Sequence, residues 1–225
     1  MNILAIDTAG ESLSIGISTE TGVFSFDTDA VTSHSRLLLD AVDALVKLAK
    51  IEREDIDLFA CMKGPGSFTG LRIGFAAVKG MALAFGKPFL SVPTLDCMAH
   101  PFAQFPGLCV PVLDAKQRRF FSALYRNGRR LSDYFDCTAE ELAGHIAANL
   151  GESAPPAPGA ALITGNGAGL VHETLSVLLP GALVLPDVSR SGRAATLLQY
   201  VKVSSILDSK EDTRASAPLY IRKSV

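Results

Sequence analysis

The sequence lacks the features that mark secreted or disulfide-stabilised proteins. Its cysteines are few, lie at least 12 residues apart and form no C-x-x-C pair. They are Cys61, Cys97, Cys109 and Cys137. This spacing within apolar stretches predicts reduced, buried thiols. The N-terminus carries an acid at position 7 and no basic region, so we expect a strand there and not a secretory signal. Together these absences indicate a cytoplasmic protein.

Long apolar runs and a strong net charge are also missing. The most apolar stretch, 73–86, is interrupted by Lys79 and falls short of the ~20 residues that a membrane span needs. The formal net charge is −2, from 21 Lys and Arg against 23 Asp and Glu, which excludes attraction of the whole chain to nucleic acid. We therefore expect no membrane association. The 225 residues suffice for one large domain or two compact lobes.

The common catalytic and metal-binding motifs are absent as well. The four histidines form no H-x-x-x-H or H-E-x-x-H pair, which would place two imidazoles on one helical face. No Walker loop and no G-x-S-x-G nucleophile elbow occurs, and nothing marks a hydrolytic triad. The sequence thus predicts no metal site and no catalytic residue of its own.

Hydrophobic periodicity predicts two similar series of elements. In the first 105 residues we expect strands at 2–7, 12–18, 23–26, 58–62 and 89–92, and helices at 33–50, 68–85 and 95–103. In the remainder we expect strands at 109–115, 120–126, 129–135, 161–165 and 182–186, and helices at 138–150, 169–179 and 193–207. Asn127-Gly128 is a hairpin signal, and Thr138 with Glu141 forms a capping box. Both series read βββαβαβα.

This duplication predicts an α/β protein with two lobes, 1–105 and a smaller 106–225. The final strand, Pro218–Arg222, is a candidate to return to the first lobe. The arrangement resembles the actin-like (ASKHA, ribonuclease H-like) superfamily, in which nucleotide lies between the lobes and carboxylates at the first strand ends hold the metal. Asp7 and Asp114 stand at those ends. An aspartate ending a strand is at least as often a turn former, and a fold alone does not establish an ATPase.

A glycine-rich segment, KGPGSFTGLRIG at 63–74, joins a strand to a helix. Its glycines permit close backbone approach, and Ser67 or Thr69 can cap a helix whose N-terminus attracts anions. A structural turn and an anion site both fit this pattern. The candidate anion contacts are Gly64, Gly66, Ser67, Thr69 and Gly70.

The two helices of the first lobe carry apolar residues on more than one side. The charged residues of 36–50 fall within an arc of ~80° at ~100° per residue, and apolar residues cover most of the rest. In 68–85, one side carries large residues and the other carries mostly small ones. Such helices are buried either by their own fold or by a partner. We expect a partner.

Six cations occur between positions 116 and 130 with no acid among them. They are Lys116, Arg118, Arg119, Arg126, Arg129 and Arg130. On a hairpin these side chains could contact phosphate, although a solvated strand face is the commoner explanation.

Several motifs together resemble the TsaB family, also called YeaZ. They are ILAIDTA, H-S-x-x-L-L at 34–39, KGPGSFTGLRIG, VPVLDAKQRRFF, TGNGA and PLYIRKS. The resemblance spans nearly the whole chain and implies an actin-like fold. It also implies a non-catalytic relative of TsaD that acts in making threonylcarbamoyladenosine beside the anticodon of tRNA.

The resemblance further implies a scaffold subunit that pairs with TsaD and forms homodimers when TsaD is absent. TsaD would carry the metal and transfer the threonylcarbamoyl group, and TsaE would bind the pair as an ATPase. ATP and metal are thus expected on partner subunits, with tRNA reached through the complex. The implied partner-binding candidates are Leu37, Leu38, Ala41, Leu45, Ile73, Ala76, Ala77, Gly80 and Ala84. The alternative is a small actin-fold ATPase or phosphotransferase using Asp7, Asp114 and the 64–70 turn.

Overall fold

The chain folds into two compact units. The computed structural model describes residues 1–29, 34–150, 159–181, 183–184, 192–203 and 216–221. Unit 1 comprises Met1–Cys97 and Ser191–Leu219, and unit 2 comprises Met98–Arg190 and Tyr220–Val225. The division falls earlier than the expected boundary at residue 106. Helix α6 (Ala194–Val203), expected in the second lobe, belongs to unit 1 because its apolar side packs on β1 and β2.

Unit 1 is built on a sheet of mixed direction. Its described strands are β1 (Ile3–Asp7), β2 (Leu13–Ser18), β3 (Val23–Thr28), β4 (Leu58–Gly64) and β5 (Phe89–Pro93). Its helices are α1 (His34–Ala49), α2 (Phe68–Phe85) and α6, with a short 3₁₀ turn at Arg53–Asp55. The strand order is β3-β2-β1-β4-β5. The first three strands are antiparallel, and β4 and β5 run parallel to β1.

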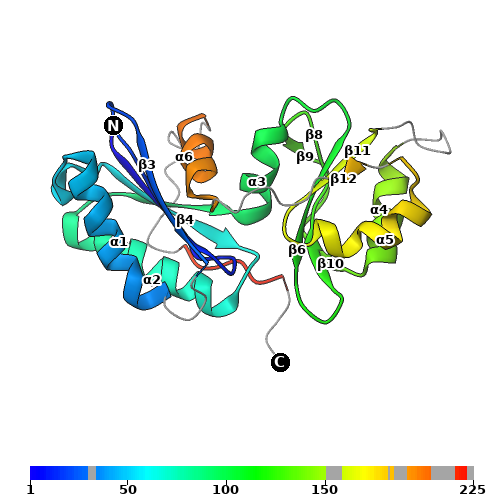
Figure 1. Ribbon diagram of the computed structural model, residues 1–225, viewed down its shortest axis with the longest axis horizontal. Coiled ribbons are helices and arrows are strands. Elements are labelled where there is room, and N and C mark those ends of the chain that lie inside the picture. Colours follow the sequence, from blue (N-terminus) through cyan, green and yellow to red (C-terminus); the bar gives the residue numbers. More distant parts are fainter. Residues whose placement is uncertain (30–33, 151–158, 182, 185–191, 204–215, 222–225) are drawn as a thin grey trace. The chain divides into compact units, whose positions relative to one another are not determined.

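The two faces of this sheet are covered by different helices. Along β1, Leu4 and Ile6 pack with α1 and α2, while Ile3 and Ala5 pack with α6. This alternation follows from the two-residue period of a strand. Figure 1 shows α1 and α2 on one side of the sheet and α6 on the other. Asp7 continues the series of Ile3 and Ala5 and therefore faces α6.

Helix α1 uses its large apolar residues for the core of unit 1. Leu38, Ala41 and Leu45, which we expected to contact a partner, are buried in the cluster with β1 and β2. The three positions lie three and four residues apart, so they form one stripe that the sheet covers. Leu37 is half-buried, whereas Leu39 and Leu48 are exposed. The prediction that Leu38, Ala41 and Leu45 contact a partner was therefore wrong.

Helix α2 begins and ends as the sequence predicts. Ser67 is its N-cap, with the Ser67 hydroxyl accepting from the Gly70 amide at 3.2 Å, and Gly86 ends it in the left-handed conformation at φ 63°. Among the described helices, α2 alone is long and apolar enough to cross a membrane. Its large residues, including Leu71, Phe75 and Val78, are nevertheless buried against the sheet of unit 1.

Unit 2 repeats the topology of unit 1. Its described strands are β6 (Leu108–Asp114), β7 (Phe120–Ser122), β8 (Tyr125–Arg126), β9 (Arg129–Arg130), β10 (Phe135–Cys137), β11 (Ala161–Thr164) and β12 (Leu183–Val184). Its helices are α4 (Ala139–Leu150) and α5 (Ala168–Leu178), while α3 (Thr94–Ala99) and a 3₁₀ turn at His100–Phe102 lead in from unit 1. The strand order β10-β7-β6-β11-β12 matches that of unit 1. The duplicated sheets confirm the expected actin-like fold.

Two local predictions in unit 2 are confirmed and one is corrected. Asn127 and Gly128 have positive φ of 50° and 72° between β8 and β9, as a two-residue hairpin requires. The Thr138 amide donates to the Glu141 carboxylate at 2.8 Å, and the Glu141 amide donates to the Thr138 hydroxyl at 3.3 Å, completing the capping box of α4. The strand expected at 120–126 is divided, because β7 pairs with β6 and β10 whereas β8 pairs with β6 and β9.

Residues 216–219 of the C-terminal segment contact β4 and β5 of unit 1, whereas Tyr220–Val225 is assigned to unit 2. The Leu219 amide donates to the Lys63 carbonyl at 2.7 Å, and the hydroxyls of Ser91 and Ser216 lie 2.7 Å apart. No strand is assigned within residues 216–221, so the strand expected at 218–222 is absent from its described part. Ser33, the proline-rich stretch at 151–158, the end of the helix at 204–207 and Arg222 lie outside the described residues.

Two leucines three residues apart on α1 test the orientation of this helix. Leu45 is 3% exposed and Leu48 is 61% exposed. We expect Leu45→Ala to lower the free energy of unfolding by about 2–5 kcal/mol, because it removes buried methyl groups and leaves a cavity. Leu48→Ala should change it by less than about 0.5 kcal/mol. Urea unfolding of both variants measures this difference, and equal effects would contradict the orientation.

Candidate functional site

Asp7, the candidate metal ligand of unit 1, is buried and already paired. Asp7 is 2% exposed. Its carboxylate accepts hydrogen bonds from the Ala9 amide at 2.7 Å and from Arg193 Nε at 2.6 Å. Arg193 immediately precedes α6. The hydrogen bond from the Ala9 amide is that of a turn-forming aspartate, the alternative to a metal ligand that the sequence left open. The bond from Arg193 matches the carboxylate charge with a guanidinium from this chain, so Asp7 does not present a free metal ligand.

The glycine-rich turn is filled by the backbone that follows β1. The Ser67 amide donates to the Ala9 carbonyl at 2.8 Å, and the Thr8 hydroxyl donates to the Gly70 carbonyl at 2.7 Å. A Cβ added at Gly66 would overlap the Ala9 carbonyl oxygen, and one added at Gly70 would overlap the Thr8 carbonyl oxygen. The glycines therefore admit this chain's own backbone. The structural explanation of this motif is favoured over an anion site.

Gly64 and Thr69 complete the set of residues expected at this turn. Gly64 has φ 107° and lies against the C-terminal segment, where an added Cβ would come within 2.6 Å of the Leu219 carbonyl oxygen. Thr69 is exposed in the first turn of α2, and Ser67 rather than Thr69 caps the helix. Gly64 thus serves the packing of unit 1, and Thr69 makes no capping contact.

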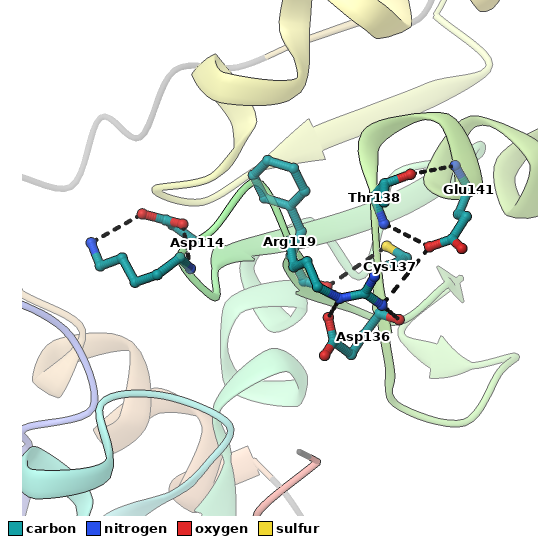
Figure 2. Close-up of polar contacts among 8 residues, drawn as sticks. Asp114, Arg119, Asp136, Cys137, Thr138 and Glu141 are labelled. Atoms are coloured by element: carbon teal, nitrogen blue, oxygen red, sulfur yellow. Dashed lines mark hydrogen bonds and ion pairs between the residues drawn. The ribbon is translucent and has the colours of Figure 1, made fainter. Parts of the chain in front are cut away.

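Asp114, the corresponding residue of unit 2, organises a local turn. Its carboxylate accepts from the Lys116 amide at 2.7 Å and from Lys116 Nζ at 3.0 Å (Figure 2). Lys116, Gln117 and Arg118 all have positive φ, at 63°, 54° and 58°, a conformation that costs about 1–2 kcal/mol per residue. The Asp114 bonds help to hold this strained turn between β6 and β7.

Most of the cations between 116 and 130 have partners within unit 2. Arg119 Nε donates to the Asp136 carboxylate at 2.7 Å, and its other nitrogen lies 3.9 Å from Glu141 at the start of α4 (Figure 2). The hydrogen bond to Asp136 raises the pKa of Arg119 above its usual value. Arg126 donates to the Asn149 carbonyl at 2.8 Å, and Arg130 lies over the Tyr134 ring at 4.0 Å. These contacts favour the structural explanation of the basic residues.

The cysteines offer no nucleophile. All four are free and buried, as expected from their spacing. Burial raises the pKa of Cys109 and of Cys137 to about 12, and it also raises the pKa of Cys61 and Cys97. Each thiol is therefore protonated at neutral pH. Among the described residues, no cluster of three or more His, Cys, Asp or Glu side chains is arranged to hold a metal ion.

The outward side of α2 carries apolar residues that unit 1 leaves exposed or half-buried. Ala76, Gly80 and Ala84 are exposed, and Ile73 and Ala77 are half-buried, so the expected division of α2 into two faces is confirmed. Two residues on this side were not predicted from the sequence: Leu83, which is 82% exposed, and Phe68, whose ring lies 3.7 Å from the Arg72 guanidinium. The residues that lie on this outer face are Phe68, Arg72, Ile73, Ala76, Ala77, Gly80, Leu83 and Ala84, here called the α2 face.

Two glycines on α2 test whether the turn is a packing contact. Gly70→Ala should lower the free energy of unfolding by about 1–3 kcal/mol, because the added methyl group would overlap the Thr8 carbonyl. Gly80 has no neighbour within 4 Å of an added Cβ, so Gly80→Ala should stabilise the protein by about 0.5–1 kcal/mol through its helix propensity. Chemical denaturation of the pair provides the comparison. A tolerated Gly70→Ala would show that the turn has room for a ligand.

Comparison with known proteins identifies relatives of this chain. Residues 27–218 match the family described as TsaD, tRNA N6-adenosine threonylcarbamoyltransferase. Proteins named tRNA threonylcarbamoyladenosine biosynthesis protein TsaB are similar, at 33% identity over 127 residues in Bacillus subtilis and 36% over 128 residues in Escherichia coli. Each match covers 56% of this chain, and 56% and 55% of the respective relative. The matched stretch thus spans about half the length of these curated relatives.

The structural comparison covers more of the chain. The solved structure of YeaZ from Pseudomonas aeruginosa superimposes with a TM-score of 0.76 at 24% identity, covering 97% of this chain and 99% of that one. This likeness shows a shared fold. The family match extends over most of the sequence, and the curated relatives carry the name TsaB. The chain therefore belongs to the TsaD family that its sequence matches and, within it, to the TsaB (YeaZ) members.

Proposed function

We propose that this protein is a non-catalytic subunit in the biosynthesis of threonylcarbamoyladenosine in tRNA. It would bind TsaD through the α2 face and stabilise it, while TsaD supplies the metal and transfers the threonylcarbamoyl group. The observation that carries the proposal is the contrast between the α2 face, which is apolar and exposed, and the actin-like site of unit 1, which the chain fills itself.

The chemistry of the α2 face fits a helix-packing partner. Its central residues, Ala76, Gly80 and Ala84, are small, so the backbone of a partner helix could approach closely. Leu83, at 82% exposed, would supply the large apolar contact that such interfaces need. Arg72 is the charged residue of this face, because Lys79 turns away to bond the Ser216 carbonyl. The absence of like charges along the face removes an electrostatic barrier to association.

The same face would serve the other associations expected of the family. Two copies of the chain could bury their α2 faces against each other when TsaD is absent, and TsaD would then displace one copy. TsaE would join the pair as the ATPase. In this scheme tRNA is bound through the complex, because most of the cations of unit 2 have partners within the protein.

The alternative, an independent ATPase or phosphotransferase, lacks support from the described residues. It would need Asp7 as a metal ligand and the 64–70 turn as a phosphate cradle. Asp7 is paired with Arg193, and Gly66 and Gly70 are packed on the backbone after β1. No observation favours this second function over the first.

Light scattering of the chain mixed with TsaD from the same organism tests the proposal. The unmodified chain should form a heterodimer with TsaD. Ala76→Glu and Gly80→Arg should each weaken this complex by about 100-fold or more, because they bury an unpaired charge at the interface.

A matched control keeps this experiment specific. Val177 on α5 of unit 2 is 76% exposed, so Val177→Glu adds a charge at an equally accessible apolar position and should leave the complex intact. Circular dichroism should show all three variants folded. Unchanged binding by Ala76→Glu and Gly80→Arg would overturn the assignment of the α2 face.

A further inference from the structure

We propose that Arg193 is a built-in counter-ion that replaces the metal of an actin-like site at Asp7, and that the segment Gly192–Ala194 fills the place of the ligand on unit 1. An actin-like fold implies a metal-bound nucleotide near the end of the first strand. The residues near the end of β1 do not fit a metal-bound nucleotide, because Arg193 pairs with Asp7 and residues 192–194 pack against the strands.

The charge of Asp7 is compensated within the chain. Asp7 is 2% exposed, and a carboxylate taken out of water needs a compensating cation. Arg193 provides one at 2.6 Å, which is the distance of a strong charge-assisted hydrogen bond. The Arg193 side chain is itself only 16% exposed. A second cation at the same oxygen would lie beside a buried guanidinium and be repelled.

The three consecutive residues 192–194 are hydrogen-bonded to three different strands. The Gly192 amide donates to Asp27 of β3 at 2.8 Å, Arg193 bonds Asp7 of β1, and the Ala194 amide donates to Ser14 of β2 at 3.0 Å. Amide groups at a helix N-terminus are ready donors to a phosphate. At the start of α6 the Ala194 amide is already satisfied by Ser14, and the Gly192 amide just before the helix is satisfied by Asp27.

The space between residues 192–194 and the strand ends is also filled. A Cβ added at Gly192 would overlap the Ser14 side chain, and one added at Gly10 would come within 2.9 Å of the Arg193 guanidinium. The segment therefore lies in direct contact with the strand ends. A phosphate group could reach Asp7 only after residues 192–194 had left the sheet.

A double-mutant cycle on the full chain tests the counter-ion. Arg193→Gln should lower the unfolding temperature by about 6 °C or more, because it leaves a buried carboxylate unpaired. Asp7→Asn combined with Arg193→Gln should recover most of that loss. Arg53→Gln is the matched control, since Arg53 bonds Asp43 at 2.6 Å but is 53% exposed. It should change the unfolding temperature by about 2 °C or less.

Calorimetric titration with Mg-ATP tests the filled site. The unmodified chain should give no saturable binding at millimolar nucleotide. Saturable binding that Asp7→Asn abolishes would overturn the proposal, as would an Arg193→Gln variant no less stable than Arg53→Gln. If Arg193→Gln does not fold, folding of the double variant supports the counter-ion, and loss of the fold in both variants contradicts it.

Discussion

The packing of the backbone after β1 onto the glycine-rich turn is the contact on which unit 1 depends. Thr8 and Ala9 lie so close to Gly66 and Gly70 that no side chain fits between them. This contact joins the central strand of the sheet to the first turn of α2, and the Ser67 cap fixes where the helix starts. Once that start is fixed, the 3.6-residue period decides which residues of α2 meet the sheet and which point outward. The position of the α2 face therefore follows from the packing of the turn at the start of the helix.

The same strand end explains why an actin-like fold need not carry actin-like chemistry. Asp7 occupies the position where the superfamily places a metal ligand, yet its charge is matched by Arg193 and its turn is closed by the Ala9 amide. Asp114 likewise organises a turn with Lys116. Among the described residues, neither carboxylate belongs to a group of three or more His, Cys, Asp or Glu side chains that could hold a metal ion. Conserving the fold while filling its site leaves the surface as the part of the protein available for function.

Much of the fold could be predicted from the sequence, because its signals are local. The bounds of α2, the hairpin at Asn127-Gly128 and the capping box at Thr138 each depend on residues a few positions apart. The assignment of α6 to unit 1 could not be predicted in this way, because it depends on contacts between residues about 180 positions apart, such as Ala194 with Ser14. The pairing of Asp7 with Arg193 was missed for the same reason. On α1, periodicity identified an apolar stripe but could not decide whether the sheet or a partner covers it, and Leu45 proved to lie in the core.

The central claim is that this chain contributes structure and not catalysis to threonylcarbamoyl transfer. Its most direct test is a reconstituted transfer assay that follows modified adenosine in tRNA with the chain alone, with TsaD and TsaE alone, and with all three together. We expect no product from the chain alone, little from TsaD and TsaE, and full activity from the mixture. Transfer by the chain alone would contradict a purely structural role. An unchanged transfer rate when the chain is added to TsaD and TsaE would also contradict it.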